Sequence, residues 1–230
     1  SSLRKHPETL VFTFTILSIV IDNDFKDNCI ELVSNDDPLE KLDHDYILHA
    51  IREAGIVGMG GAAFPGNVKA LSAMGHVDTL IANGCECEPY ITADDSLLRT
   101  DPEHVLEGMD ILRQVLKPER AVVAVEDNKA EAIEKINALL KDHPGIELVV
   151  LPTRYPQGAE KQLIQSVTGR QVPPGKLPVS VGCAVFNVST YAAIYRPNSS
   201  ADAGVSLIST LRKPKLVDTV STTRPFLSFS

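Results

Sequence analysis

The middle of the chain alternates between two hydrophobic periods, and this alternation restricts the fold more than any other feature of the sequence. Apolar runs typical of buried strands lie at residues 77–83, 121–126 and 146–151. Segments with helical periodicity lie between them, at residues 102–116 and 129–141. Parallel strands need long crossover connections, which are usually helices. The sequence therefore predicts an α/β fold, with a Rossmann-like, mostly parallel sheet flanked by helices.

The helix predicted at residues 102–116 has clear signals at its start and along one face. Asp101 is a typical N-cap residue, Pro102 suits the first turn, and Glu103 places an acid at the positive end of the helix dipole. Four apolar residues then recur at helical spacing and should face the core: Val105, Met109, Leu112 and Leu116.

Three further elements extend this pattern. A helix is predicted at residues 45–53, and Gly55 is placed to end it in a left-handed conformation. Another helix is predicted at residues 157–168, and a further strand at residues 181–188. These elements enlarge the predicted sheet and the helical layers that cover it.

The two ends of the chain lack this alternation. Residues 1–39 hold short β-branched runs, which predict a β fragment. The longest apolar stretch, residues 10–21, falls short of the about 20 residues that a membrane-spanning helix needs. We therefore expect a β fragment at residues 1–39, an α/β domain at residues 40–196 and an unassigned tail at residues 197–230.

Charge and cysteine content narrow the classes of function. The formal net charge of -8 disfavours a nucleic-acid partner, because phosphate binding requires a basic patch. Four cysteines in 230 residues do not form a disulfide framework. We expect a cytoplasmic protein whose cysteines remain thiols.

The glycine-rich segment at residues 55–69 is the strongest indication of a ligand site. Glycines allow left-handed backbone conformations and a close approach of the main chain to a ligand. Successive backbone N–H groups that lead into a helix can bind a phosphate, and Lys69 would add a positive charge. A glycine-rich turn between two helices, without a ligand, is the alternative interpretation.

Part of this segment also matches the dinucleotide-binding fingerprint. Gly58 to Ala63 fit the pattern, and Asp78 follows about 20 residues later, as the fingerprint requires. A true fingerprint follows a strand, whereas this segment follows the helix predicted at residues 45–53. We therefore expect the match to be misleading.

Polar residues follow the first predicted strand at once. Asn83 can donate and accept hydrogen bonds, and Glu86 and Glu88 provide two carboxylates. Open α/β sheets bind ligands beyond the carboxyl ends of their strands, so these side chains are suitably placed. Cys85 and Cys87 lack the spacing of a zinc or iron–sulfur site, and we predict no metal ligand among the residues of this chain.

Two later residues complete the set of candidates. Glu160 lies where residues 155–162 enter a helix, and an isolated acid there is also typical of a solvated first turn. Asn187 lies at the end of the strand predicted at residues 181–188, in the same situation as Asn83. Both positions predict polar side chains close to the ends of secondary-structure elements, where ligands often bind.

These segments together resemble the C-subunit family of the Rnf ion-translocating electron-transport complex. They are more remotely similar to the NADH-oxidising flavoprotein subunit of respiratory complex I. The resemblance extends over residues 17–196, and the order of five blocks makes it specific. The blocks are residues 55–65, 83–94, 126–129, 155–163 and 187–188.

The resemblance implies an NADH-linked flavin oxidoreductase subunit. FMN would bind through Gly58, Gly60, Gly61, Lys69, Asn83, Glu86 and Asn187. NADH would contact Phe64, Glu88 and Glu160. The flavin itself accepts the hydride, so no catalytic side chain is implied. The implied partners are the other subunits of a membrane-bound complex that couples NADH/ferredoxin electron transfer to ion translocation, with this protein peripheral on the cytoplasmic face.

Members of this family also carry a β-grasp-like domain and two cysteine motifs that bind [4Fe-4S] clusters. Neither cysteine motif occurs in the 230 residues. The chain is therefore expected to be a fragment of such a protein that lacks the iron–sulfur domain. Residues 1–39 would be the last strands of an N-terminal barrel-like domain.

The chain departs from the family pattern at several positions. Ala63 and Ser189 stand where the family usually has glycine, and Gly66 and Asn67 replace threonine and histidine. The methyl group of Ala63 would reduce the affinity for flavin if backbone and ligand are close there.

Two other functions remain open at the level of sequence. One is a cobalamin-reductase-type flavoprotein, a family that is similar over the glycine-rich loop. The other is a non-catalytic remnant that keeps the fold and acts as a docking module for a partner. The departures at Ala63 and Ser189 and the missing cluster motifs favour the second of these.

Overall fold

The computed structural model describes residues 39–195, so the predicted tail and all of the predicted β fragment except Leu39 lie outside the described part. The described strands are β1 (Thr79–Gly84), β2 (Arg120–Glu126), β3 (Ile146–Leu151) and β4 (Cys183–Asn187). The described helices are α1 (His44–Glu53), α2 (Gly66–Ala73), α3 (Ala93–Thr100), α4 (Pro102–Leu116), α5 (Ala130–Leu139), α6 (Glu160–Thr168) and α7 (Val188–Ile194). None of these helices is long and apolar enough to cross a membrane.

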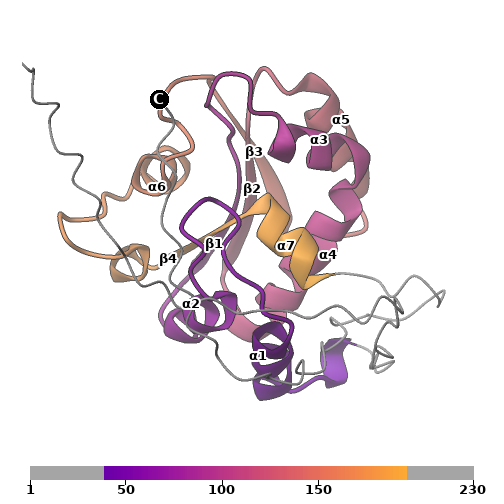
Figure 1. The fold of residues 1–230 in the computed structure, drawn as a ribbon, viewed down its shortest axis with the longest axis vertical. Helices are drawn as coiled ribbons and strands as arrows, with labels where there is room; N and C mark the ends of the chain where they lie inside the picture. The colour runs from indigo at the N-terminus through magenta and orange to yellow at the C-terminus, as the bar shows by residue number, and fades with distance from the viewer. Residues whose placement is uncertain (1–38, 196–230) are drawn as a thin grey trace, which may run out of the picture. The chain divides into compact units, whose positions relative to one another are not determined.

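The four strands form one parallel sheet in the order β3-β2-β1-β4, which confirms the predicted α/β class (Figure 1). Asn83 on β1 lies beside Asn187 on β4, and Gly84 on β1 lies beside Val125 on β2. The chain moves outward from β1 to β3 and then returns to the other side of β1 with β4. The direction of strand order thus reverses between β1 and β4, and ligands of open α/β sheets bind at such a switch point.

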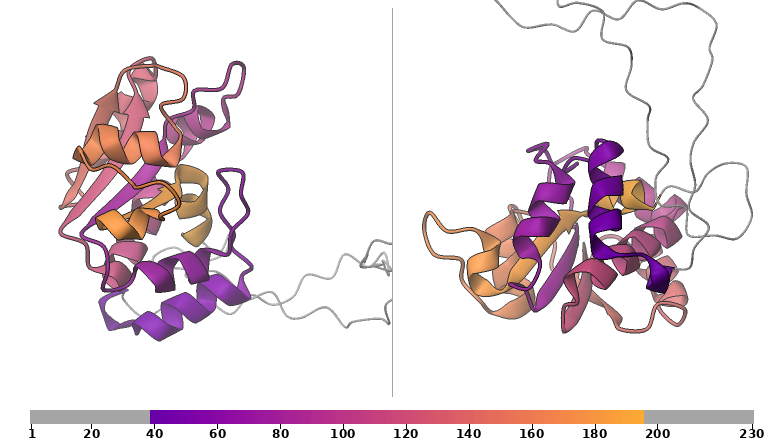
Figure 2. Two further views of the ribbon diagram at one scale, coloured as in Figure 1. Left: turned by 90° about the vertical axis from the view of Figure 1, so that its left-hand side faces the viewer. Right: turned by 90° about the horizontal axis from the view of Figure 1, so that it is seen from below.

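Helices cover both faces of the sheet, but unequally. Leu163 and Ile164 of α6 pack with Ile81 and Val185 on one face. The opposite face carries the larger core, to which α1, α2, α4, α5 and α7 all contribute buried residues. In the left-hand view of Figure 2, the orange helix α6 lies in front of the sheet. The division of the buried side chains of β1 between two cores follows from this arrangement, because successive side chains of a strand point to opposite faces.

Helix α4 has the predicted boundaries, and the predicted apolar face is buried. The exposed fractions of Val105, Met109, Leu112 and Leu116 do not exceed 3%. The role predicted for Asp101 is wrong in one respect. Asp101 occupies the N-cap position, but its carboxylate contacts Nδ1 of His104 at 2.5 Å and makes no capping hydrogen bond. A partner in the first turn therefore competes with the backbone for this side chain.

The other predicted strands and helices between residues 45 and 188 are also present, with shifted ends. Gly55 has a φ of 66°, as predicted for a residue that ends α1. Helix α6 begins at Glu160 and not at residue 157, because a turn in which Ala159 donates to Pro156 precedes it.

Three short helices were not predicted from the sequence: α2, α3 and α7. Helix α3 has only eight residues and buries only Leu98 completely, so it offers few apolar positions from which a helix could be predicted. Its start is stabilised by a distant residue, because the Glu86 carboxylate accepts hydrogen bonds from the backbone N–H groups of Asp94 (3.0 Å) and Asp95 (3.3 Å). Such a contact cannot be seen in the local sequence.

Helices α4 and α7 approach each other at backbone distance. A Cβ atom placed on Gly108 of α4 would lie 1.9 Å from the carbonyl oxygen of Tyr191 on α7. The Tyr191 side chain is fully buried and donates a hydrogen bond to the carbonyl of Ile81. The absence of a side chain at Gly108 is therefore what allows α7 to pack at the end of the sheet.

We predict that Gly108→Ala destabilises the protein by about 2–4 kcal/mol, because the methyl group would overlap the backbone of α7. Urea unfolding followed by circular dichroism measures this change. Alanine normally stabilises a helix relative to glycine. A more stable Gly108→Ala variant would therefore contradict the contact between α4 and α7.

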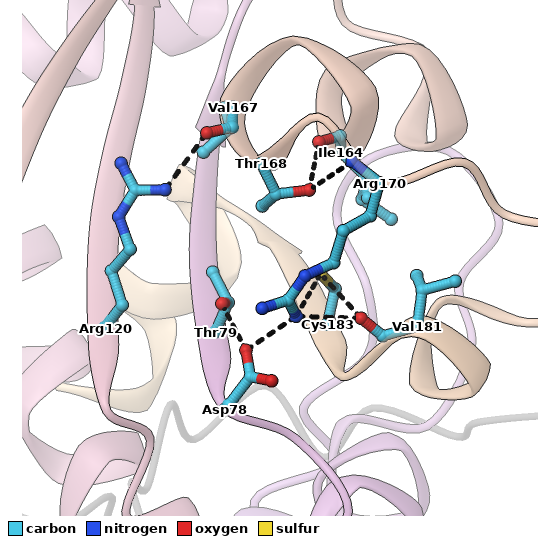
Figure 3. A network of polar contacts seen from close by, with 9 residues as sticks. All are labelled: Asp78, Thr79, Arg120, Ile164, Val167, Thr168, Arg170, Val181 and Cys183. Carbon is cyan, nitrogen blue, oxygen red and sulfur yellow. Dashed lines mark hydrogen bonds and ion pairs between the residues drawn. The ribbon is translucent and has the colours of Figure 1, made fainter.

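A polar network fixes the amino end of β1 to the connection between α6 and β4 (Figure 3). The Nη1 atom of Arg170 donates to Asp78 Oδ1 at 2.7 Å and to the carbonyl of Val181 at 2.9 Å. Thr79 donates its hydroxyl to the same carboxylate oxygen at 2.6 Å. Gly182 has a φ of 72°, and a Cβ there would lie 2.8 Å from Asp78 Oδ2. The network thus joins three segments, at Asp78, Arg170 and Val181, near the amino end of β1. Asn83 and Asn187 lie near the opposite, carboxyl ends of their strands.

The hydrogen bond from Arg170, followed by that from Thr79, lowers the pKa of the Asp78 carboxyl. The side chains of Asp78 and Arg170 are 39% and 41% exposed, so solvent screening limits the energy. We expect Asp78→Asn to cost about 0.5–1 kcal/mol at neutral pH. A lowered carboxyl pKa stabilises the folded state at pH values above the ordinary carboxyl pKa, so the difference between the two proteins should shrink progressively as the pH falls below about 4.

Denaturant unfolding at several pH values measures this difference. Asp142→Asn is a matched control, because its contact with Lys141 is long (3.9 Å) and both side chains are exposed. The interpretation fails if the two variants lose the same stability at neutral pH.

Candidate functional site

The glycine-rich segment forms a hairpin-like loop between α1 and α2. Val57 and Pro65 form an antiparallel bridge, and Gly58 donates its N–H to the carbonyl of Phe64 at 2.8 Å. The loop follows a helix and not a strand, which confirms that the dinucleotide fingerprint is misleading. Asp78, the acid that the fingerprint would require, binds Arg170 at the amino end of β1, away from the loop.

The tip of this loop presents open backbone. Gly61 has a φ of 108°, and a Cβ placed on it would meet no atom within 4 Å. Within residues 39–195, the backbone N–H groups of Gly60 and Gly61 donate to no other group. Unpaired donors on an open backbone are what an anionic or heterocyclic ligand requires.

The same loop is anchored at the carboxyl end of the sheet. The N–H of Met59 donates to the Thr190 hydroxyl at 3.0 Å, and a Cβ on Gly60 would lie 3.4 Å from Cβ of Asn187. Thr190 belongs to α7, which begins directly after β4. Figure 2 shows the loop beside α7 in its left-hand view. The glycine-rich loop therefore lies at the switch point between β1 and β4.

Asn83 and Asn187 lie on neighbouring strands near their carboxyl ends, and each organises the loop that follows it. Asn83 Oδ1 accepts the N–H of Cys85 at 3.1 Å, and its Nδ2 donates to the carbonyl of Gly158 at 2.9 Å. Asn187 Oδ1 accepts the N–H of Ser189 at 2.8 Å and so caps α7. The two amides hold three chain segments together around the strand ends.

Asp94 connects α3 to the β4–α7 junction. Asn187 Nδ2 donates to Asp94 Oδ2 at 2.6 Å, and the Ser189 hydroxyl donates to Oδ1 at 3.1 Å. Burial raises the pKa of the Asp94 carboxyl, although both hydrogen bonds oppose this effect and the nearby charges of Glu86 and Glu88 add to it. The serine that departs from the family pattern thus has a partner in this structure.

Lys69 and Glu160 form an ion pair across the site. The Nζ atom of Lys69 on α2 lies 2.8 Å from Oε1 of Glu160 at the start of α6. The same ammonium group lies 5.2 Å from the ring centroid of Phe186. The two side chains are 32% and 40% exposed, so both remain accessible to a ligand.

Residues 51–196 match the family of Nuo51 FMN-binding domains. The chain belongs to this family. It is also a homologue of the C subunit of ion-translocating oxidoreductase complexes. It is 42% identical over 201 residues to the C subunit of the ion-translocating oxidoreductase complex of Haemophilus influenzae (strain PittEE). It is 45% identical over 194 residues to the C subunit of the proton-translocating ferredoxin:NAD(+) oxidoreductase complex of Clostridium ljungdahlii.

These alignments cover 87% and 83% of this chain but 31% and 41% of the two relatives. A solved structure of an NAD+-reducing [NiFe]-hydrogenase in its air-oxidized state also resembles the fold. Its TM-score is 0.59 at 28% sequence identity, and the match covers 66% of this chain and 30% of the hydrogenase chain. The shared part is thus one domain of larger proteins.

The structure of the FMN-binding domain brings most of the predicted site residues to one end of the sheet. The glycine-rich loop approaches Asn187, and Lys69 meets Glu160. The side chain of Phe64 is 50% exposed at the base of the loop. Glu88 is exposed, and it makes no hydrogen bond to any other predicted site residue within the described range.

Glu86 differs from this pattern, since it is 7% exposed and both of its oxygens bind the start of α3. Its contribution to cofactor binding remains a prediction. Sequence reasoning missed Asp94 and Thr190 as parts of the site. Both lie next to predicted residues in space but not in a pattern that marks them, although Asp94 ends the second block of the family resemblance.

Ala63 stands at a position of the FMN-binding domain that suits glycine. Its φ is 47°, in the left-handed region that costs a residue with a Cβ about 1 kcal/mol. The preference of the family for glycine thus has a conformational reason here, in addition to any contact with the ligand.

We predict that Ala63→Gly stabilises the protein by about 0.5–1 kcal/mol, because the left-handed strain is removed. Thermal or urea unfolding would measure this gain. Ala62→Gly is the matched control, because Ala62 does not have a positive φ. Equal destabilisation by both substitutions would show that residue 63 is not strained.

Proposed function

We propose that this chain is the FMN-binding core of the C subunit in a membrane-bound, Rnf-type complex. It binds FMN and exchanges electrons with NAD(H), and the complex couples NADH/ferredoxin electron transfer to ion translocation. The chain lies peripherally on the cytoplasmic face and depends on the other subunits for its activity. The name of the Clostridium ljungdahlii relative, part of a ferredoxin:NAD(+) oxidoreductase complex, supports this electron-transfer role.

One observation carries the proposal. The open amides of Gly60 and Gly61 lie on a loop that is fixed to α7 at the switch point of the sheet. This is where an open α/β sheet binds its ligand, and an exposed main chain suits the phosphate or the ring edge of FMN. The residues present therefore fit the cofactor that the family binds.

The remaining roles are those that the family resemblance implies. FMN would be held by the loop and the strand ends, through Gly58, Gly60, Gly61, Lys69, Asn83, Glu86 and Asn187. NADH would be held by Phe64, Glu88 and Glu160. When bound, the flavin supplies the hydride chemistry, and the side chains position both molecules.

Lys69 and Glu160 are assigned to different ligands but contact each other in the structure. A phosphate dianion competes with the Glu160 carboxylate for the ammonium group of Lys69. Binding of the cofactor phosphate would then leave Glu160 available for a ribose hydroxyl. The ion pair is consistent with an FMN subsite and an NADH subsite that lie side by side and meet at Lys69 and Glu160.

We propose that the flavin passes its electrons on to a cluster that residues 39–195 do not carry. Residues 39–195 contain no cluster of histidine, cysteine and acidic side chains that could hold a metal. The [4Fe-4S] motifs expected in full-length family members are absent from the 230 residues. The onward acceptor is therefore proposed to be a cluster outside this sequence.

An FMN titration of the purified chain, followed by visible absorbance, tests the proposal. We expect saturable binding of about one flavin per chain, and bleaching of the bound flavin when NADH is added without oxygen. A folded chain that binds no flavin would refute the proposal and support the docking-module alternative. Binding without reduction by NADH would refute the assignment of the nucleotide residues.

Gly60→Ala is the sharpest variant for the loop. Gly60 does not have a positive φ, and its Cβ would only touch Asn187 at 3.4 Å, so the fold should tolerate the methyl group. We predict at least a roughly tenfold loss of FMN affinity, because the methyl group blocks close approach to the backbone. An unfolding curve of the same sample provides the control, and unchanged affinity with unchanged stability would refute the proposed role of the loop.

A further inference from the structure

Glu126 is the last residue of β2, and its side chain is completely buried. Neither carboxyl oxygen makes a hydrogen bond of ordinary distance and angle, although the backbone N–H of Arg154 lies nearby, and no other buried side chain within residues 39–195 shares this property. Buried polar groups are almost always paired, and an unpaired carboxylate is far more costly to bury than an unpaired neutral acid. This residue therefore needs an explanation that strand pairing does not provide.

The surroundings of Glu126 place it beneath the candidate site. Its neighbour Val125 lies beside Gly84, so Glu126 lies next to Cys85, where the chain leaves β1. Ala124, two residues earlier, packs with Cys85 and Leu151 on the face that α6 covers. Because alternate side chains of a strand share a face, Glu126 points to that same side.

The loop after β1 and the loop before α6 meet at Cys85, which lies next to Glu126. A Cβ on Gly158 would lie 2.2 Å from the carbonyl oxygen of Cys85, so the two backbones touch. Gly158 also accepts the hydrogen bond of Asn83, and the helix that begins with Glu160 follows two residues later. Glu126, which lies next to Cys85, is therefore close to one side of the contact between the loop after β1 and the loop before α6.

Burial raises the pKa of the Glu126 carboxyl, whereas the nearby backbone amide of Arg154 and the charge of Lys129 act in the opposite direction. The charges of Asp127 and Glu88 raise it further. Burial is the largest cause of the raised pKa of the Cys85 thiol, which is about 12. The groups that face Glu126 from its own and the adjacent segments are Cys85, Glu88, Asp127, Lys129 and Arg154.

Asp127, the next residue, has the opposite environment. It is exposed, and it accepts hydrogen bonds from the N–H (3.0 Å) and the hydroxyl (2.6 Å) of Thr153, which lower the pKa of its carboxyl. The two adjacent carboxyls thus lie in opposed environments, and their pKa values shift in opposite directions.

We propose that Glu126 is a positioning residue: its buried carboxyl, in the neutral form, holds the loops carrying Asn83 and Glu160 in the arrangement that receives the nucleotide ligands. A neutral side chain fills the space below the loops without adding a negative charge beneath ligands that carry phosphate groups. Ionisation would place an unpaired charge beside Glu88 and separate the loops. The inference that the loops receive nucleotide ligands rests on the proposed function. The inference that Glu126 supports the loops in its neutral form does not.

The first test is the stability of Glu126→Gln against pH. A raised carboxyl pKa contributes stability below the unfolded value, and this contribution is lost as the pH rises through the folded value. Glutamine imitates the neutral acid, so the variant should match the wild type near about pH 4 and unfold at a higher temperature near about pH 8. A variant less stable than the wild type at both pH values would overturn the inference.

The second test measures positioning without a ligand, by hydrogen–deuterium exchange of residues 83–88 and 154–159. We expect faster exchange in Glu126→Ala, and wild-type exchange in Glu126→Gln, because the neutral isostere restores the support. The control is Asp127→Asn, which should leave residues 83–88 unchanged. Slow exchange in all three variants would show that Glu126 does not position the loops.

The third test is FMN affinity between about pH 6 and about pH 9. The wild type should lose severalfold more affinity with rising pH than Glu126→Gln, while Asp127→Asn should follow the wild type. The comparison removes the titration of the FMN phosphate, which all three proteins share. Identical pH profiles would refute the role of the charge, whereas no flavin binding by any protein would refute the proposed function and leave the first two tests decisive.

Discussion

The candidate site depends on the parallel pairing of β1 with β4. This pairing places Asn83 beside Asn187 and creates the point where strand order reverses. The glycine-rich loop reaches this point only because α7, which follows Asn187, offers the Thr190 hydroxyl to Met59. Packing at Gly108 allows α7 to lie there. A contact between two helix backbones is thus a condition for the geometry of the loop.

Much of the fold could be predicted from the sequence, because its strands and its longer helices carry strong hydrophobic periods. Helix α4 shows this most clearly, since its boundaries and its buried face agree with the pattern. Helix α3 could not be predicted from its own residues, because its first N–H groups donate to the carboxylate of Glu86, which lies outside the helix. Helix α7 has a local N-cap in Asn187, but its seven residues are too few to show a clear hydrophobic period. The contact of Asp101 with His104 shows the same limit at a single residue. Local propensity does not reveal which partner a polar side chain will choose.

The residues of the site could be predicted from the sequence, but the hydrogen bonds between them could not. The glycine pattern and the residues after each strand identified the loop and the two asparagines, which the structure brings together. The bonds of Asp94 to Asn187 and Ser189 join positions more than 90 residues apart. The left-handed conformation of Ala63 could not be predicted either, because no residue next to it in the sequence indicates a positive φ. Resemblance to a family marked the position, and the structure supplied the conformational reason.

The candidate site contains many acidic side chains, although the ligands proposed for it carry negatively charged phosphate groups. The structure shows how most of these acids are occupied. Glu86 is occupied by the start of α3, and Glu160 is paired with Lys69. Asp94 is bound by two donors, and Glu126 is buried. Few of these charges therefore act freely on an approaching phosphate. Attraction must then come mainly from backbone N–H groups and Lys69, which makes the conformation of the glycine-rich loop more important than the net charge around it.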